Sequence, residues 1–146
     1  MYRLIYLSEA RRRMSPEEID AIVGKSRRKN DKCHVAALLI PMGGRFLQVL
    51  EGDAAQVTAR FHRIAADPRH GEIRVVCEGP SAEAPLCATP MDWRARADLT
   101  ASQAGALAEA FELADLLGDV TYCPRPRHKA RRLREVLPVF ACPHLA

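Results

Sequence analysis

Phe46-Leu-Gln-Val-Leu-Glu-Gly52 is the stretch that decides the fold of this chain. It predicts a β-strand, because apolar side chains alternate along it and two glycines, at positions 43 and 44, supply a tight hairpin turn before it. On strict alternation Phe46, Gln48 and Leu50 share one face of the strand. Gln48 therefore places a primary amide among apolar neighbours, where it needs hydrogen-bond partners. Those partners are either neighbouring side chains or a bound ligand.

The composition indicates one globular domain with a short extension. The chain has 146 residues, of which 48% are hydrophobic, and this is enough for a sizeable core. No apolar run is long enough to span a membrane, and no signal-peptide pattern begins the chain. Five cysteines without paired spacing favour the cytoplasm. A net charge of +4, concentrated in short basic segments, permits phosphate-bearing ligands, nucleic acid or an acidic partner surface.

Helices and strands are expected to alternate on both sides of this stretch. Ser15 and Glu18 form a capping box that begins a helix at Pro16, and Thr100 with Gln103 predicts the same device for a later helix. Four strands are expected at residues 3–8, 35–40, 46–52 and 72–78, with a weaker fifth within 86–93. Further helices are expected over residues 53–66 and, in the basic C-terminal part, over residues 127–137.

This order predicts an α+β fold. It is a ferredoxin-like β-α-β-β-α-β sandwich with a fifth strand and C-terminal helices, in which two helices cover one face of the sheet. The helix that begins after Thr100 is expected to cover part of the opposite face. We therefore expect a domain over residues 1–95 and a helical extension over 96–146 that packs on the sheet.

Four segments stand out for their order along the chain. They are Arg3-Leu-Ile-Tyr6 with Ser8, Asn30 at the end of the first helix, residues 46–52, and Asp67-Pro-Arg-His70 after the second helix. Together they resemble the BLUF family of blue-light sensors that use flavin. The resemblance covers about residues 1–93. It implies a bound flavin, most often FAD, with FMN or riboflavin as alternatives, held between the two helices on one face of the sheet.

The resemblance also implies roles for particular side chains. Tyr6 and Gln48 match the family's relay to the flavin ring, in which the tyrosine gives an electron and a proton and the glutamine then rotates or changes tautomer. Met91 matches a methionine beside that glutamine. The residues that match flavin-binding positions, or stand beside one, are Ser8, Lys29, Asn30, Asp67, Arg69 and His70.

Two strands depart from the family pattern. His34-Val-Ala-Ala37 stands where relatives carry a glycine-containing string, and proline and threonine replace the arginine and tryptophan of the fifth strand. The sequence thus leaves two rivals to the photoreceptor open. One is a BLUF-like module that has lost its flavin and binds other proteins, and the other is a flavin-dependent redox enzyme.

Other functional classes find little support in the sequence. No catalytic set can be argued from spacing, so the chain is expected not to be an enzyme. Cys123 and Cys142-Pro-His144 lack a paired metal-binding spacing, and no metal site is expected. The basic segment around Arg131 carries no interleaved aromatic residues, which argues against nucleic acid. Signalling is expected to reach a protein partner or the chain's own oligomer, without a membrane.

Overall fold

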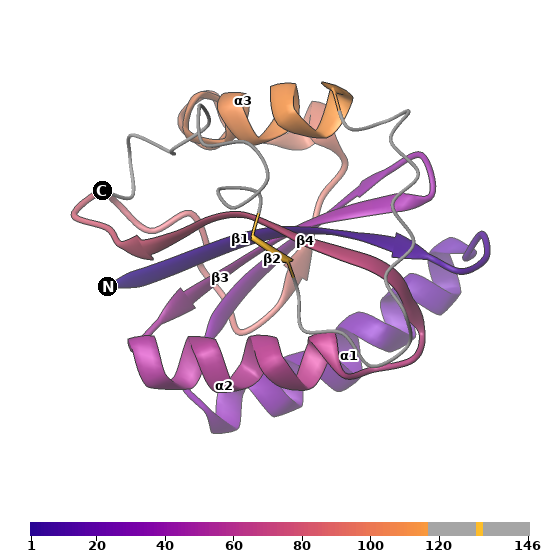
Figure 1. Ribbon diagram of the computed structural model, residues 1–146, viewed down its shortest axis with the longest axis horizontal. Coiled ribbons are helices and arrows are strands. Elements are labelled where there is room, and N and C mark those ends of the chain that lie inside the picture. The colour runs from indigo at the N-terminus through magenta and orange to yellow at the C-terminus, as the bar shows by residue number, and fades with distance from the viewer. Residues whose placement is uncertain (117–130, 133–146) are drawn as a thin grey trace.

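A mixed β-sheet lies between helices α1 (Pro16–Lys32) and α2 (Ala54–Ala65) on one side and helix α3 (Ala101–Leu116) on the other (Figure 1). The computed structural model describes residues 1–116 and 131–132. In chain order the elements are β1 (Tyr2–Ala10), α1 (Pro16–Lys32), β2 (Ala36–Met42), β3 (Arg45–Gly52), α2 (Ala54–Ala65), β4 (His70–Pro80), β5 (Asp92–Trp93), the 3₁₀ turn η1 (Arg96–Asp98), α3 (Ala101–Leu116) and β6 (Arg131–Arg132). This is the α+β sandwich that the sequence predicts.

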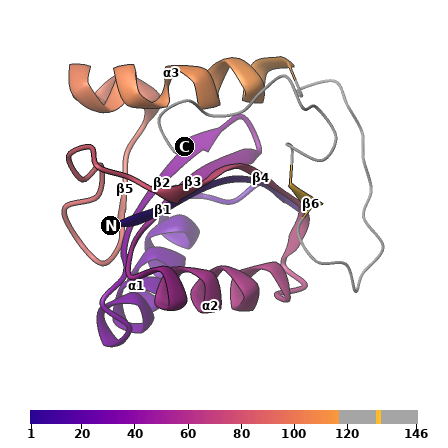
Figure 2. The ribbon, with the colours of Figure 1, turned by 60° about the vertical axis from the view of Figure 1, so that its left-hand side comes forward.

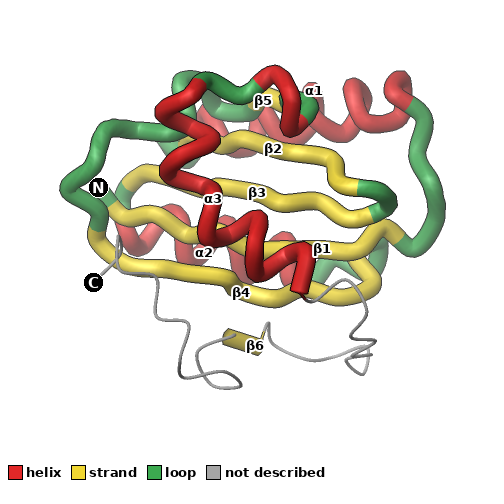
Figure 3. Tube along the Cα trace, turned by 90° about the horizontal axis from the view of Figure 1, so that it is seen from above, coloured by secondary structure: helices red, strands yellow, loops and turns green. Residues whose placement is uncertain are grey.

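The two central strands of the sheet, β3 and β1, carry residues 46–52 and the segment from Arg3 to Ser8. Among the described residues the sheet has six strands, in the order β5-β2-β3-β1-β4-β6. β1 is antiparallel to both β3 and β4, so it lies at the centre. At one edge β5 pairs in parallel with β2, and at the other edge β6 pairs in parallel with β4. Figures 2 and 3 show these two short strands on either side of the four long ones. A residue of β1 therefore faces a partner on β3 deep inside the molecule.

Side-chain caps fix where the helices begin. The Ser15 hydroxyl accepts from the Glu18 backbone N–H while the Glu18 carboxylate accepts from Ser15, and this confirms the predicted capping box of α1. Thr100 and Gln103 form the same reciprocal pair at α3. Asp53 caps α2 by accepting from two backbone N–H groups.

Glycine is needed at the two ends of β3. Gly43 and Gly44 have φ angles of 57° and 88°, which a hairpin turn requires and most side chains resist. At the other end Gly52 has a φ of 154°, and a Cβ there would lie 3.0 Å from the His34 carbonyl oxygen. The last residue of the deciding stretch is therefore glycine because the chain before β2 passes directly against it.

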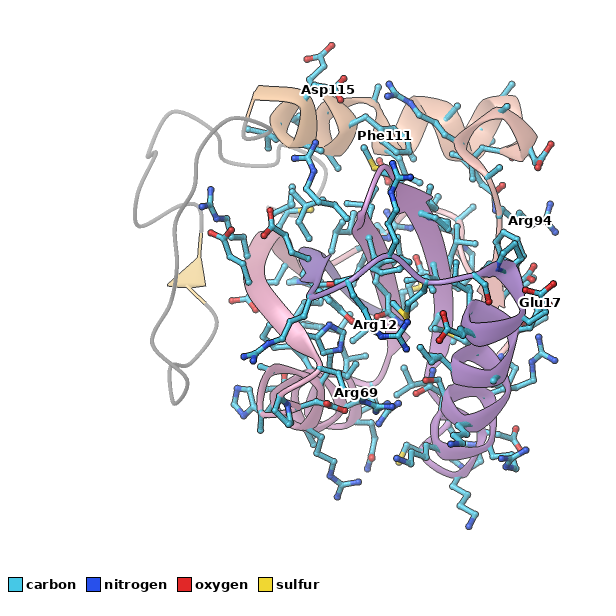
Figure 4. All side chains as sticks on the ribbon, turned by 90° about the vertical axis from the view of Figure 1, so that its right-hand side faces the viewer. Arg12, Glu17, Arg69, Arg94, Phe111 and Asp115 are labelled. Atoms are coloured by element: carbon cyan, nitrogen blue, oxygen red, sulfur yellow. The ribbon has the colours of Figure 1, made fainter. Side chains whose placement is uncertain are left out.

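The sheet separates two hydrophobic clusters. On the α1–α2 face the buried residues of β3 are Phe46 and Leu50, whereas Leu47 and Val49 face α3. The predicted alternation of this strand is thus confirmed. Helix α3 buries Leu107 and Phe111 against the opposite face, and Figure 4 shows Phe111 on the side of α3 nearest the sheet.

Three parts of the chain differ from the expected elements. The fifth strand is reduced to Asp92–Trp93, since Pro90 precedes it and cannot donate to a ladder. The basic helix expected over residues 127–137 is wrong at Arg131–Arg132, which pair in parallel with Arg74 and Val75, and its other residues lie outside the described ones. His34 has a φ of 52° and precedes β2, so the turn, not a strand, sets its direction.

Two absences hold for the described part of the chain. No helix there is long and apolar enough to cross a membrane. No group of three or more His, Cys, Asp or Glu side chains there is placed to hold a metal ion. Cys123, Cys142 and His144, which the sequence offers as weak metal candidates, lie outside it.

Candidate functional site

Tyr6 and Gln48 meet at the centre of the sheet. They are direct partners in the register of β1 and β3, so their side chains leave the same face side by side. The Tyr6 hydroxyl donates a hydrogen bond to Gln48 Oε1. Tyr6 has no exposed surface and Gln48 is 6% exposed. Burial raises the pKa of the Tyr6 phenol well above its ordinary value, so the hydroxyl keeps its proton.

Met91 completes this contact from the edge of the sheet. Gln48 Nε2 lies 3.4 Å from Met91 Sδ, to which it donates a weak hydrogen bond. The Gln48 amide thus has its oxygen on a strong donor and its nitrogen on a weak acceptor. An amide held so unevenly can exchange the weaker bond for a better one when it turns.

Tyr6, Gln48 and Met91 begin a layer of polar contacts on the α1–α2 face of the sheet. Asn30, in the last turn of α1, belongs to the same layer. Its Nδ2 donates to the Pro90 carbonyl oxygen at 2.6 Å, and its Oδ1 accepts from Arg60 Nε at 2.5 Å. The side chain has no exposed surface. Asn30 therefore links α1, α2 and the segment before β5 in one buried polar contact.

Arg60 is a site residue that sequence reasoning misses. It lies on α2 between Val57 and Phe61, and only 9% of its surface is exposed. Desolvation lowers the pKa of its guanidinium, and the neighbouring Tyr6 opposes this shift. In the sequence it reads as a solvated helix position, and no other signal marks it.

Apolar groups form the walls of this layer. The rings of Tyr6 and Phe61 lie 5.2 Å apart between centroids at an interplanar angle of 58°, a tilted aromatic pair. Phe46, on the same strand as Gln48, also lines a cavity of about 310 Å³ at the beginning of α1. Arg12, Arg13 and Arg45 are among the residues around that cavity. This volume is at the lower limit of ordinary ligand pockets.

The other predicted site residues lie further out. Lys29 is exposed, and the Arg69 guanidinium pairs with the Asp67 carboxylate at 2.5 Å beyond the end of α2. Figure 4 shows Arg69 beside that helix end. His70 begins β4, and burial lowers the pKa of its imidazole. Ser8 is buried two residues beyond Tyr6. The structure thus brings together Tyr6, Asn30, Gln48 and Met91, and joins none of the other five to them by a hydrogen bond.

Besides the bond from Asn30 to Pro90, two hydrogen bonds hold the Met91 segment against α1. Arg27 Nε donates to the Met91 carbonyl oxygen at 2.9 Å, and the Trp93 indole N–H donates to Asp20 Oδ1 at 2.6 Å. Trp93 thus packs at the border of the α1–α2-side cluster and bonds to α1 and not to Gln48.

A buried ion pair stabilises the chain before Met91 from the other face. Arg3 Nε donates to Glu51 Oε1 at 2.6 Å, and both side chains are 2% exposed. The Glu51 carboxylate also accepts from the backbone N–H groups of Leu86 and Cys87. This explains the glutamate in the deciding stretch, because it attaches the segment before Met91 to β3.

The chemistry of the layer suits a flat heteroaromatic ligand with carbonyl and N–H groups on one edge. Two amides, a phenol and a guanidinium offer both donors and acceptors there. These groups now bond to one another. Tyr6 and Asn30 have no exposed surface, so a ring reaches these groups only when neighbouring side chains move.

Comparison with known proteins identifies the class. The family described as "Sensors of blue-light using FAD", BLUF, matches residues 1–91. The chain belongs to the BLUF family of blue-light sensors, the family that its four segments resemble.

Individual relatives agree with this assignment. The chain is 32% identical over 117 residues, 80% of its length, to the photoactivated adenylate cyclase subunit beta of Euglena gracilis. It is 34% identical over 76 residues, 51% of its length, to the blue light- and temperature-regulated antirepressor BluF of Escherichia coli. The matched parts are 13% and 19% of those proteins. The chain therefore spans a small share of its curated relatives.

Solved structures share the fold. The dark-state structure of BlrB, a BLUF protein, superposes with a TM-score of 0.61 at 30% identity and covers 80% of this chain and 85% of BlrB. A bacterial light-regulated adenylyl cyclase superposes with a TM-score of 0.63 over 80% of this chain and 34% of the cyclase. Its 21% identity supports the fold alone.

Proposed function

We propose that this chain is a blue-light photoreceptor that binds FAD between α1 and α2 and signals through the Tyr6–Gln48 hydrogen bond. One observation carries the proposal: the phenol and the amide are register partners on adjacent central strands, bonded to each other and buried. A phenol and an amide placed in this way can pass a proton and reverse a hydrogen bond without moving the backbone.

A bound flavin would supply blue-light absorption and an excited state that takes up an electron and a proton. Tyr6 would provide both, the proton from its hydroxyl oxygen. Gln48 would then turn or change tautomer, because its bond to the Tyr6 hydroxyl is lost and its bond to Met91 Sδ is weak. Asn30 would hold the carbonyl and N–H edge of the ring through its amide, with Ser8, Lys29, Asp67, Arg69 and His70 as the further binding residues.

We place the flavin-binding domain at residues 1–95 and treat residues 96–146 as the helical extension. Met91 contacts Gln48, and Gln103 of α3 donates to the Leu86 carbonyl oxygen at 3.0 Å. The segment between these contacts thus connects the switch with α3. We infer that the output is a contact with a protein partner or with a second copy of the chain, in the cytoplasm.

The test is an absorption spectrum of the purified chain after reconstitution with FAD, in darkness and after blue light. A flavin band that shifts to longer wavelength and recovers in the dark is the expected result. Gln48→Leu is expected to bind flavin and lose the shift, whereas Gln56→Leu, an exposed change on α2, keeps it. A normal shift in Gln48→Leu would remove that residue from the mechanism.

A second candidate is a BLUF-fold interaction module without flavin. The observation in its favour is the pairing of Tyr6 with Gln48 and of Arg60 with Asn30, since these buried groups already have partners within the protein. Failure of FAD, FMN and riboflavin to bind at micromolar concentrations would select this module.

A further inference from the structure

Arg60 brings a positive charge into the layer of Tyr6 and Asn30. It is more than nine-tenths buried, and one of its nitrogens, Nε, donates to Asn30 Oδ1 at 2.5 Å. Neither the resemblance nor the spacing of polar residues assigns this arginine a role. It lies one turn from Ile64 on the inner stripe of α2, where the other buried residues are apolar.

No anion within the described residues balances this charge. The ion pairs there join Arg3, Arg12, Arg69, Arg74, Arg94 and Arg96 to carboxylates, and none involves Arg60. Its hydrogen bond to Asn30 engages an amide, which is neutral. Among the described residues the one fully buried side-chain nitrogen or oxygen without a hydrogen-bond partner is Glu109 Oε2, so the Arg60 Nη groups reach the surface, where a ligand can accept their hydrogen bonds.

The guanidinium is held beside the Asn30 amide. Its Nε donates to Asn30 Oδ1, and Asn30 Nδ2 donates to the Pro90 carbonyl oxygen, so the amide that holds the guanidinium is itself held. Within the described residues its two Nη groups form no hydrogen bond. Guanidinium groups present paired donors to planar acceptors. A ring carbonyl beside the Asn30 amide is an acceptor of this kind.

We propose that Arg60 is the cationic donor to the carbonyl edge of the flavin ring, and so a specificity-determining residue of the site. This inference rests on the proposed function. It concerns the ring and not the phosphates, because Arg60 lies beside Tyr6 and Asn30, neither of which has any exposed surface. The charged phosphates of FAD or FMN remain near water, where the exposed Lys29 and Arg69 lie.

The experiment compares riboflavin, which has no phosphate, with FMN. Dissociation constants are measured by flavin fluorescence titration of the full chain and of Arg60→Met, Arg60→Gln and Arg60→Lys. Arg28→Met is the matched control, since it removes the same charge from an exposed position on α1. Circular dichroism and urea midpoints show which variants fold, and Arg60→Gln carries the test if Arg60→Met does not.

The expected result is a weakening of about 10- to 100-fold for both ligands in Arg60→Met and Arg60→Gln, the value of a hydrogen bond to a charged group. Arg60→Lys should recover part of this affinity, and Arg28→Met should stay within about twofold. Loss with FMN alone would assign Arg60 to the phosphate and overturn the proposal. Unchanged or tighter riboflavin binding in Arg60→Met and Arg60→Gln would show that Arg60 does not bond to the ring, and would overturn the proposal as well. If the unmodified chain binds neither ligand, the proposed function also fails.

Discussion

The two faces of the same four long strands are built for different purposes. Toward α3 the strands present a large apolar cluster together with two largely buried ion pairs, Arg3–Glu51 and Arg74–Glu72. Toward α1 and α2 the same strands place Tyr6 and Gln48 among apolar residues, and the helices add Asn30 and Arg60. The comparison teaches that apolar packing holds both faces, and that the polar groups differ in kind. Toward α3 charges pair with opposite charges, whereas toward α1 and α2 amide oxygens accept from a phenol and a guanidinium.

The largest expected effect comes from the Arg3–Glu51 ion pair on the α3 face. Glu51→Ala leaves the Arg3 charge buried and removes the acceptor of two backbone N–H groups, so it should lower the free energy of unfolding by about 3–5 kcal/mol. Urea denaturation measures this. Glu83→Ala, which removes a 41% exposed partner of Arg3, is the control and should cost less than about 1 kcal/mol. Equal effects would show that burial does not decide the strength of this pair.

A change on the α1–α2 face tests whether its polar groups also stabilise. Tyr6→Phe removes the donor to Gln48 Oε1 and leaves that oxygen buried, so unfolding should become easier by about 1–3 kcal/mol. The variant should also lose the light-induced shift. Urea denaturation and the difference spectrum are measured on the same sample. A light-induced absorption shift of normal size in Tyr6→Phe would show that the Tyr6–Gln48 hydrogen bond is not needed for the light response.

Matched caps offer a smaller comparison between the faces. Ser15→Ala and Thr100→Ala each remove a hydroxyl that caps a helix, one at α1 and one at α3, and each should cost about 1 kcal/mol. Thermal unfolding of both variants gives the two values under one condition. A much larger cost at Thr100 would indicate that the start of α3 supports more than its own helix.

The smallest effect concerns acid. The hydrogen bond and charge of Arg69 hold the pKa of the Asp67 carboxyl at about 2, below its ordinary 3.8. A carboxylate with a lowered pKa stabilises the fold fully above its ordinary pKa, and this contribution disappears as the pH falls from about 4 through about 2. Because Arg69 is 65% exposed, less than about 1 kcal/mol is expected. Asp67→Asn should remove this part of the acid dependence in urea midpoints between pH 5 and pH 2, roughly.

Local patterns in the sequence were enough to predict most of the sheet. Alternation in residues 46–52 gave the face of Gln48, and the glycine pair gave the hairpin, since both depend on neighbours in the chain. The two capping boxes were predicted for the same reason. The meeting of Tyr6 and Gln48 needed the family resemblance, because register between distant strands is not written in either strand alone.

What the sequence did not reveal depends on distant contacts. From the sequence alone Arg60 is expected to be a solvated helix residue, but in the fold it lies beside Asn30 and Tyr6. Glu51 is likewise expected to be a polar residue at a strand end, but in the fold it bonds to Arg3 and to two backbone N–H groups. The pairing of Arg131–Arg132 with β4 overrode a helical pattern, as tertiary contacts often override local propensity. These are long-range effects that spacing cannot encode.

The hydrogen bond between Trp93 and Asp20 gives this molecule a built-in optical probe. The chain contains one tryptophan, so all indole emission arises from the point where the short edge strand touches the first helix. Fluorescence excited in the ultraviolet thus follows that junction without any attached dye. Separation of the edge strand from the helix breaks this hydrogen bond, and the wavelength and intensity of the emission then report the changed surroundings of the indole.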